Sequence, residues 1–219
     1  MTPGLPRGVL WDMDGTLIDS AEYHWLTWRD ALAEEGVTLV RDEFHSWFGS
    51  RNDRILQRYF GAGISAAEIA RIGGRKEERY RAMVRERGVA PLPGIRDWLR
   101  RLREAGWCQA VASSAPAANI AVLIEALELG AVFQATVSAE DVTQGKPHPD
   151  VFLEAAGRLG VVPGRAVVVE DAPVGVEAGR RGGMRTIGIA ALHVSLDADV
   201  VTFSMADLPE DAFDRLVPR

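Results

Sequence analysis

The stretch Val-Leu-Trp-Asp-Met-Asp-Gly-Thr, residues 9–16, constrains the fold and the chemistry of this chain more than any other. Its apolar start is typical of a buried strand, and Gly15 then allows the backbone to turn sharply. Residues two apart in a strand point the same way, so we expect the Asp12 and Asp14 carboxylates on one side of the strand end. Two such carboxylates repel each other unless a cation or a shared proton compensates. The stretch therefore predicts a metal site in which one carboxylate also acts as a nucleophile or an acid, the alternative being an ordinary Asp-Gly turn.

Composition limits the partners and the location of the protein. The chain has 219 residues, 47% of them hydrophobic, and a formal net charge of −6. This size suits one large domain, or one domain with an insertion, and the negative charge predicts no general attraction to nucleic acid or to an anionic membrane. The single cysteine, Cys108, cannot form an internal disulfide, and we find no signal segment and no apolar run of roughly 18 residues. We therefore expect a cytoplasmic monomer that acts on a small molecule.

Strands and helices are expected to alternate through the second half of the chain. Helices are predicted at 95–105, 117–129, 149–159 and 174–181, and strands at 107–112, 135–138, 166–169 and 185–190, with 200–201 as a candidate edge strand. Such alternation implies parallel pairing, and nearly continuous apolar strands suit a sheet that is covered on both faces. The predicted fold is α/β, a doubly wound (Rossmann-like) parallel sheet, in which ligands bind at the carboxyl ends of the strands.

A helical insert interrupts this pattern after the first strand. About seventy residues after Asp19 read as helical, including a capping-box pattern that starts at Ser65, and their many Arg and Glu residues read as a solvated helical face. The Pro- and Gly-rich segment 88–94 reads as a hinge. We expect a core formed by residues 1–19 and 93–219 and an α-helical cap formed by residues 20–92, which would emerge beside the site as a lid does.

Three further motifs fall at predicted strand ends or in the loops that follow them. Ser113 and Ser114 follow one strand, where hydroxyls and backbone N–H groups hold phosphate oxygens or simply cap a helix. Lys146 lies between Gly and Pro and supplies a fixed positive charge, unless it is an ordinary surface lysine. Glu170 and Asp171 end the buried strand 166–169, where Asp171 suits Mg²⁺ as an acidic oxygen ligand from a second strand.

In their order and spacing these motifs resemble the four motifs of the haloacid dehalogenase (HAD) superfamily. The resemblance covers essentially the whole chain and rests on Asp12 and Asp14, Ser113, Lys146, and Glu170 with Asp171. It is strongest to the branch with an α-helical cap after the first strand, which contains β-phosphoglucomutase-like enzymes and small-molecule phosphatases.

This resemblance implies a mechanism. Asp12 attacks phosphorus and becomes an aspartyl-phosphate, while Asp14 protonates the leaving alcohol and then activates water. Mg²⁺ is held by Asp12, Asp171 and the backbone carbonyl of Asp14, and Glu170 positions either metal-bound water or Lys146. Ser113, Ser114 and Lys146 bind the phosphate oxygens. Two alternative functions fit less well. A dehalogenase works without a metal and does not need Asp14 as an acid, and a receiver-type signalling domain does not need a helical insert.

The choice between phosphatase and phosphomutase depends on the cap. His24 resembles a histidine of β-phosphoglucomutases that positions the acid/base and the sugar, but many phosphatases also carry it. Mutases place Lys before a cap-loop glycine and Arg three residues after it; if Gly49 is that glycine, Phe48 and Asn52 stand there. Arg51 or Arg54 is a candidate substitute. The missing cations favour a phosphatase of small, sugar-phosphate-like metabolites, with a phosphomutase as the alternative and a non-enzymatic phospho-acceptor as a remote one.

Overall fold

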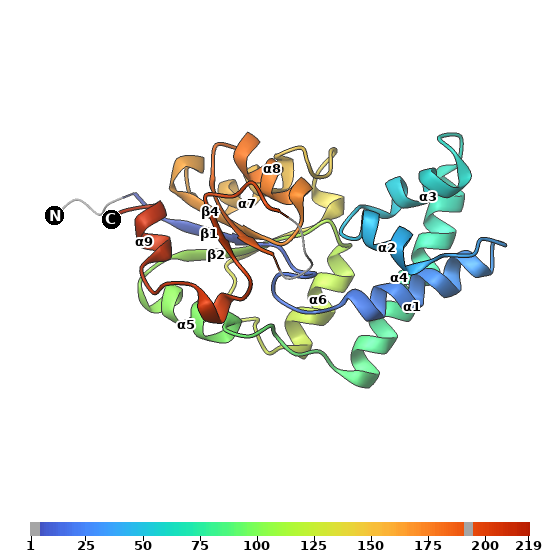
Figure 1. Ribbon diagram of the computed structural model, residues 1–219, viewed down its shortest axis with the longest axis horizontal. Coiled ribbons are helices and arrows are strands. Elements are labelled where there is room, and N and C mark those ends of the chain that lie inside the picture. The colour runs from blue at the N-terminus through green and yellow to red at the C-terminus, as the bar shows by residue number, and fades with distance from the viewer. Residues whose placement is uncertain (1–4, 191–194) are drawn as a thin grey trace.

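A computed structural model describes residues 5–190 and 195–219, and its centre is a six-stranded sheet of order β3-β2-β1-β4-β5-β6 (Figure 1). All neighbouring strands pair in parallel. The strands are β1 (Gly8–Trp11), β2 (Cys108–Ala112), β3 (Ala135–Val137), β4 (Ala166–Glu170), β5 (Arg185–Ile189) and β6 (Val200–Thr202). This order reverses direction between β1 and β4, so the predicted doubly wound fold is confirmed.

Helices cover both faces of the sheet (Figure 1). One face carries α5 (Ile95–Glu104), α6 (Ala117–Ala126) and α9 (Ala212–Leu216), and the other carries α7 (Asp150–Arg158) and α8 (Pro173–Arg181). Strand side chains alternate between the two layers: Val9 and Trp11 pack with α5 and α9, whereas Leu10 packs with α7. This two-sided burial explains why the strands read as continuous apolar runs.

The insert contains four helices and has an apolar core of its own. They are α1 (Ala21–Ala33), α2 (Arg41–Trp47), α3 (Asn52–Phe60) and α4 (Ala66–Arg87). Aromatic side chains dominate this core, with Trp28 and Phe44 fully covered and Trp47 packed edge-on against both. The Ser65 capping box opens α4 as predicted. The short helix α2 was not predicted: it has seven residues, and Val40 stands at its N-cap in place of a capping residue.

The two segments that connect the insert to the rest of the chain lie side by side. The Leu92 N–H donates to the Leu17 carbonyl at 2.9 Å, and Ile18 forms an antiparallel bridge with Pro91. Tyr80 of α4 packs into the same apolar cluster as Leu17. The insert is therefore anchored directly beside the carboxyl end of β1.

The other predicted elements agree with the structure to within a few residues. The helix expected to reach residue 129 ends at Ala126 and continues as a turn in which Glu128 has a φ of 57°. The predicted edge strand is present as β6, while α9 was not predicted. None of the helices in the described ranges has the length and apolar character that crossing a membrane requires.

Candidate active site

The predicted site residues meet at the carboxyl edge of three neighbouring strands. Asp12 follows β1, Ser113 follows β2 and Glu170 ends β4, and the Asp12 N–H continues the ladder by donating to Val169 at 3.0 Å. Lys146 reaches the same point from the loop before α7. The sheet topology, with β1 between β2 and β4, brings these distant residues together.

Lys146 lies between two carboxylates. Its Nζ donates to Asp12 Oδ1 at 2.5 Å and to Glu170 Oε1 at 2.6 Å, and only 4% of its side chain is exposed. Burial lowers the pKa of Lys146, but Asp12 and Glu170 outweigh it and raise that pKa well above its usual value. Lys146 is thus a permanently charged buried group and not a surface lysine. Glu170 also accepts from the Ala172 N–H at 2.8 Å, so both its oxygens are engaged.

The acidic residues here carry more negative charge than Lys146 balances. Asp12, Glu170 and Asp171 each offer an oxygen within 4.8 Å of the others. Burial, together with the neighbouring Glu170, raises the pKa of Asp12 to about 8 against the opposing effect of Lys146, and burial also raises the pKa of Asp171. This surplus of buried carboxylate oxygens fits a hard divalent cation such as Mg²⁺.

Gly15 provides the room for this acidic cluster. It has a φ of +88°, and a β-carbon at this position would lie 2.1 Å from Asp171 Oδ2. Only glycine satisfies both the backbone angle and the close approach. The Thr16 hydroxyl, 3.3 Å from Asp171 Oδ1, donates to the same carboxylate. The Asp-Gly sequence is therefore tied to the site and is more than an ordinary turn.

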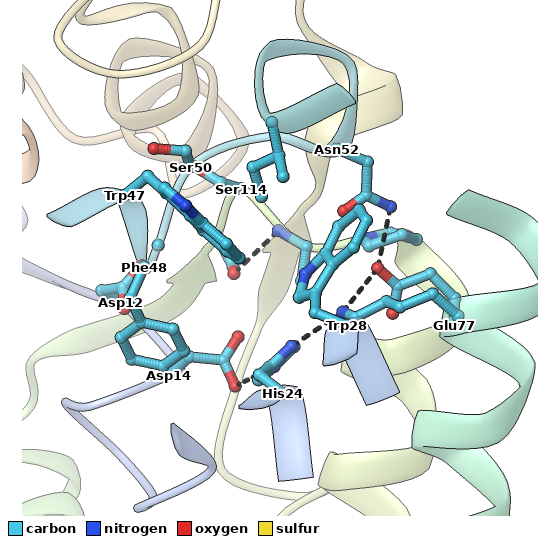
Figure 2. Close-up of a pocket in the computed structure, with 16 residues that line it drawn as sticks. Asp12, Asp14, His24, Trp28, Trp47, Phe48, Ser50, Asn52, Glu77 and Ser114 are labelled. Atoms are coloured by element: carbon cyan, nitrogen blue, oxygen red, sulfur yellow. Dashed lines mark hydrogen bonds and ion pairs between the residues drawn. The ribbon is translucent and has the colours of Figure 1, made fainter. Parts of the chain in front are cut away.

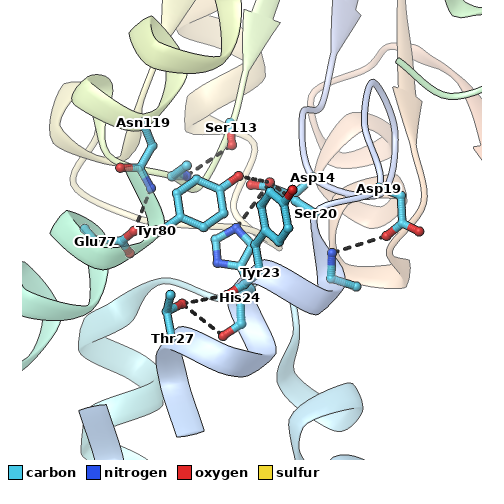
Figure 3. A network of polar contacts seen from close by, with 12 residues as sticks. Asp14, Asp19, Ser20, Tyr23, His24, Thr27, Glu77, Tyr80, Ser113 and Asn119 are labelled. Carbon is cyan, nitrogen blue, oxygen red and sulfur yellow. Dashed lines mark hydrogen bonds and ion pairs between the residues drawn. The ribbon is translucent and has the colours of Figure 1, made fainter. Parts of the chain in front are cut away.

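The Asp14 side chain lies apart from the cluster and belongs to a second set of contacts (Figure 3). Its Oδ1 accepts from the Ser20 hydroxyl at 2.5 Å and the Tyr80 hydroxyl at 3.4 Å, and lies 3.2 Å from His24 Nε2. Burial raises the pKa of Asp14, but His24 and Ser20 outweigh it and lower that pKa to about 2. The two aspartates thus lie in different environments: Asp12 is buried among other carboxylates, whereas hydrogen-bond partners hold Asp14 as a carboxylate.

A buried polar network extends from His24 of α1 to α4 and α6 (Figures 2 and 3). His24 Nδ1 lies 2.7 Å from Lys76 Nζ, which contacts Glu77 Oε1 at 2.9 Å. Glu77 also accepts from Asn52 at 2.8 Å and from Asn119 of α6 at 2.6 Å. Lys76 and Glu77 are 1% and 4% exposed, so the interpretation of the Arg and Glu residues as a solvated face was wrong at Glu77.

An inner cavity lies between the strand ends and the insert (Figure 2). It is lined at one end by Asp12, Asp14 and the loop 113–116, and at the other by side chains of the insert: Trp28, Trp47, Phe48, Asn52, Ile55, Lys76 and Glu77. Phe48 packs edge-on against the His24 ring. The predicted cap residues Phe48 and Asn52 therefore line the same cavity as Asp12 and Asp14.

Arg51 and Arg54 do not line the inner cavity. The Arg51 guanidinium donates to the backbone carbonyls of Ala139 and Val142 at 3.1 and 3.2 Å. A neighbouring outer hollow, lined by residues 49–51, 53–54, 114, 143–148 and 174, contains Arg51, Arg54 and His148. Ser114 borders both spaces, whereas the Ser113 hydroxyl is buried and accepts from the Ala115 N–H at 3.1 Å.

Comparison with known proteins places the chain in a family. A family profile described as haloacid dehalogenase-like hydrolase matches residues 9–189. The chain is 36% identical over 192 residues to hexitol phosphatase A of Escherichia coli, covering 84% of this chain and 83% of that enzyme. It is 30% identical over 210 residues to β-phosphoglucomutase of Bacillus subtilis, covering 92% and 91%. A crystal structure of CbbY from Rhodobacter sphaeroides with xylulose 1,5-bisphosphate matches with a TM-score of 0.85 at 27% identity, over 93% of this chain and 96% of that one.

Two of these relatives are named as a phosphatase and a phosphoglucomutase, and the matches span both the sheet and the insert. The chain belongs to the haloacid dehalogenase-like hydrolase family.

Proposed function

We propose that this chain is a Mg²⁺-dependent phosphatase that hydrolyses small, sugar-like phosphate esters through an aspartyl-phosphate on Asp12. The observation that carries the proposal is the separation of two aspartates. Asp12 lies against Lys146 within an acidic cluster, while Asp14 is held by Ser20 and His24 on the side of the insert. One carboxylate is thus placed to attack and the other to exchange protons.

The metal would be held by the oxygens around Asp12. We assign Asp12, Asp171 and the backbone carbonyl of Asp14 as its protein ligands, with Glu170 next to them as the partner of Lys146. When bound, Mg²⁺ supplies positive charge that offsets the carboxylates and the phosphate dianion.

The chain's own residues account for both halves of the reaction. Asp12 forms a bond to phosphorus as the bond to the leaving alcohol breaks, and Asp14 gives that alcohol its proton. Water then attacks phosphorus, Asp14 takes a proton from it, and the Asp12–phosphorus bond breaks. Ser113 and Lys146 hold the phosphate oxygens, over which transition-state charge spreads. Asp14 is ionised in the free protein, and the charge of an arriving phosphate favours the proton uptake that the first half needs.

We assign residues 20–92 to a cap and residues 1–19 and 93–219 to the core. The separate apolar core of the insert and the joined segments at Leu17 and Leu92 support this division. The cap supplies His24, Phe48 and Asn52 to the inner cavity, so it excludes water from the carboxylates while it covers them.

Hydrolysis is favoured over mutase activity because the inner cavity offers no unpaired cationic side chain among the described residues to bind a second phosphate. Phe48 and Asn52 are uncharged, and Arg51 donates to core carbonyls. With β-glucose 1-phosphate and catalytic glucose 1,6-bisphosphate we expect release of inorganic phosphate and little glucose 6-phosphate. Faster accumulation of glucose 6-phosphate than of phosphate would show a phosphomutase instead.

A further inference from the structure

The end of the inner cavity away from Asp12 has an unusual balance of charge. Its wall combines aromatic and aliphatic side chains with three polar groups, Asn52, Lys76 and Glu77 (Figure 2). A leaving group that enters the inner cavity with its phosphate at Asp12 extends toward these groups. Their charge state therefore decides what kind of leaving group the cavity accepts.

The one lysine of this wall is neutralised by its neighbour in the sequence. Lys76 Nζ is 2.9 Å from Glu77 Oε1, and their side chains are 1% and 6% exposed. Two carboxamides, those of Asn52 and Asn119, hold the Glu77 carboxylate in place from opposite sides. On its other side Lys76 faces His24, which in turn faces the Asp14 carboxylate. The positive charge of Lys76 is thus already matched by the buried Glu77 carboxylate.

The cations of the outer hollow do not change this balance. Arg51 is bonded to Ala139, Val142 and Asp53, and Lys146 is bonded to Asp12 and Glu170. Arg54 is exposed, so solvent and salt screen its charge. A carboxylate or a second phosphate buried at the far end would lose its hydration without gaining a free cation.

Hydroxyl groups, by contrast, fit the groups that are present. The Asn52 carboxamide uses one N–H for Glu77, and the described residues form no other hydrogen bond with its side chain. It can donate to and accept from a hydroxyl. The faces of Trp28 and Trp47 offer apolar surface for carbon-bound hydrogens.

We propose that the enzyme selects esters whose leaving group is an uncharged polyol or sugar and rejects those with a second anion, and that Glu77 sets this selectivity. The inference rests on the proposed phosphatase activity and names its substrate class. Glu77 acts by cancelling the charge of Lys76, which would otherwise attract an anionic group.

A matched pair of substrates tests the proposal on the unaltered protein with Mg²⁺. Sorbitol 6-phosphate and 6-phosphogluconate have the same six-carbon skeleton and the same phosphate, but end in a hydroxymethyl group and a carboxylate respectively. We expect kcat/KM to favour sorbitol 6-phosphate by on the order of 10- to 100-fold, the range expected when a charge enters a site without a partner. Equal values, or a preference for 6-phosphogluconate, would overturn the proposal.

Two isosteric variants of adjacent residues locate the effect. Glu77→Gln removes the buried charge, and Glu78→Gln removes the same charge from an exposed position on the same helix. We expect Glu77→Gln to narrow the substrate ratio at least about fivefold and Glu78→Gln to leave it unchanged. If the ratio of kcat/KM for the two substrates were equal in the two variants, Glu77 would not determine the selectivity, whatever the effect on total activity.

Two other outcomes separate this inference from the proposed function. A preference for 6-phosphogluconate that is lost in Arg54→Ala would place the far end of the substrate in the outer hollow and overturn the inference alone. Failure to hydrolyse either ester while p-nitrophenyl phosphate is turned over would also overturn the inference alone. No turnover of any phosphate ester would overturn the proposed function and the inference with it.

Discussion

Replacing Gly175 with alanine should lower both stability and activity, because it displaces Glu170 from Lys146. Gly175 is the third residue of α8, and a β-carbon there would lie 1.8 Å from Glu170 Oε1 and 2.0 Å from Glu170 Cδ. Oε1 is the oxygen that accepts from Lys146 at 2.6 Å. The glycine is thus required by space, because the carboxylate lies directly against the first turn of the helix. Alanine must push Glu170 away from Lys146.

The size of the effect follows from opposing contributions. Alanine in a helix stabilises by about 0.5–1 kcal/mol relative to glycine. Against this, losing a hydrogen bond between charged groups costs about 1.5–3 kcal/mol. The net loss is about 1–2 kcal/mol, which corresponds to roughly 2–8 °C in Tm for a chain of this size. Because Lys146 also loses its position beside Asp12, kcat should fall by about 10- to 100-fold.

Gly157→Ala is the matched control. Gly157 lies in α7, which like α8 has nine residues, and its β-carbon would have no atom within 4 Å. We expect this variant to keep full activity and to gain up to about 1 kcal/mol. Thermal unfolding by circular dichroism and turnover of p-nitrophenyl phosphate measure both effects. If Gly175→Ala were as stable and as active as Gly157→Ala, the reasoning about Glu170 and Lys146 would be refuted.

Three other predictions concern the nucleophile, the metal and the exposed carboxylate of Asp141. Asp12→Asn should lower kcat by about three orders of magnitude or more while the protein stays folded, because an amide oxygen is a poor nucleophile; near-normal turnover would exclude covalent catalysis by Asp12. EDTA should abolish turnover and Asp171→Ala should raise the Mg²⁺ concentration needed for half-maximal activity at least about tenfold; chelated enzyme that still hydrolyses esters would contradict the metal assignment. Hydrogen bonds from Ser138, then Arg158, lower the pKa of Asp141 from 3.8 to about 2, and solvent screens this exposed carboxylate, so Asp141→Asn should cost only about 1 kcal/mol at pH 7. That contribution is complete above pH 3.8 and is lost as the pH falls toward 2, so urea unfolding at pH 7 and pH 3 should show a smaller difference between variant and wild type at pH 3.

Site residues could be predicted from the sequence where polar side chains directly follow a buried strand. Carboxylates directly after the apolar runs that became β1 and β4 cannot be explained by burial alone, so Asp12 and Asp171 stood out. Parallel strands bring their carboxyl ends to one edge, and the meeting of Asp12 with Glu170 and Asp171 follows from this rule. Lys146 comes from a loop, and its place at the site was expected from the family resemblance alone.

The polar network of the insert was not predicted. Lys76 and Glu77 lie among many charged residues of α4, and nothing in a helical pattern distinguishes the two that are buried. Their burial depends on how α4 packs against α1 and α6, which brings His24 and Asn119 to them from 52 and 42 residues away. The available signal was the apolar stripe formed by Ile72, Tyr80 and Val84, whose spacing marks the face of α4 that is covered.

The closeness of Leu17 and Leu92 makes the insert a separable piece of the chain. Cutting out the residues between them would leave two ends already joined by one hydrogen bond, so a turn of a few residues would reconnect β1 to α5 with little loop-closure entropy. The shortened protein would lose the apolar cover that Tyr80 and Val84 give to Leu17, and would need polar substitutions there. We expect an insert of another length or sequence joined at this point to leave the register of β1 and β4 unchanged, because the pairing of these strands does not involve the insert.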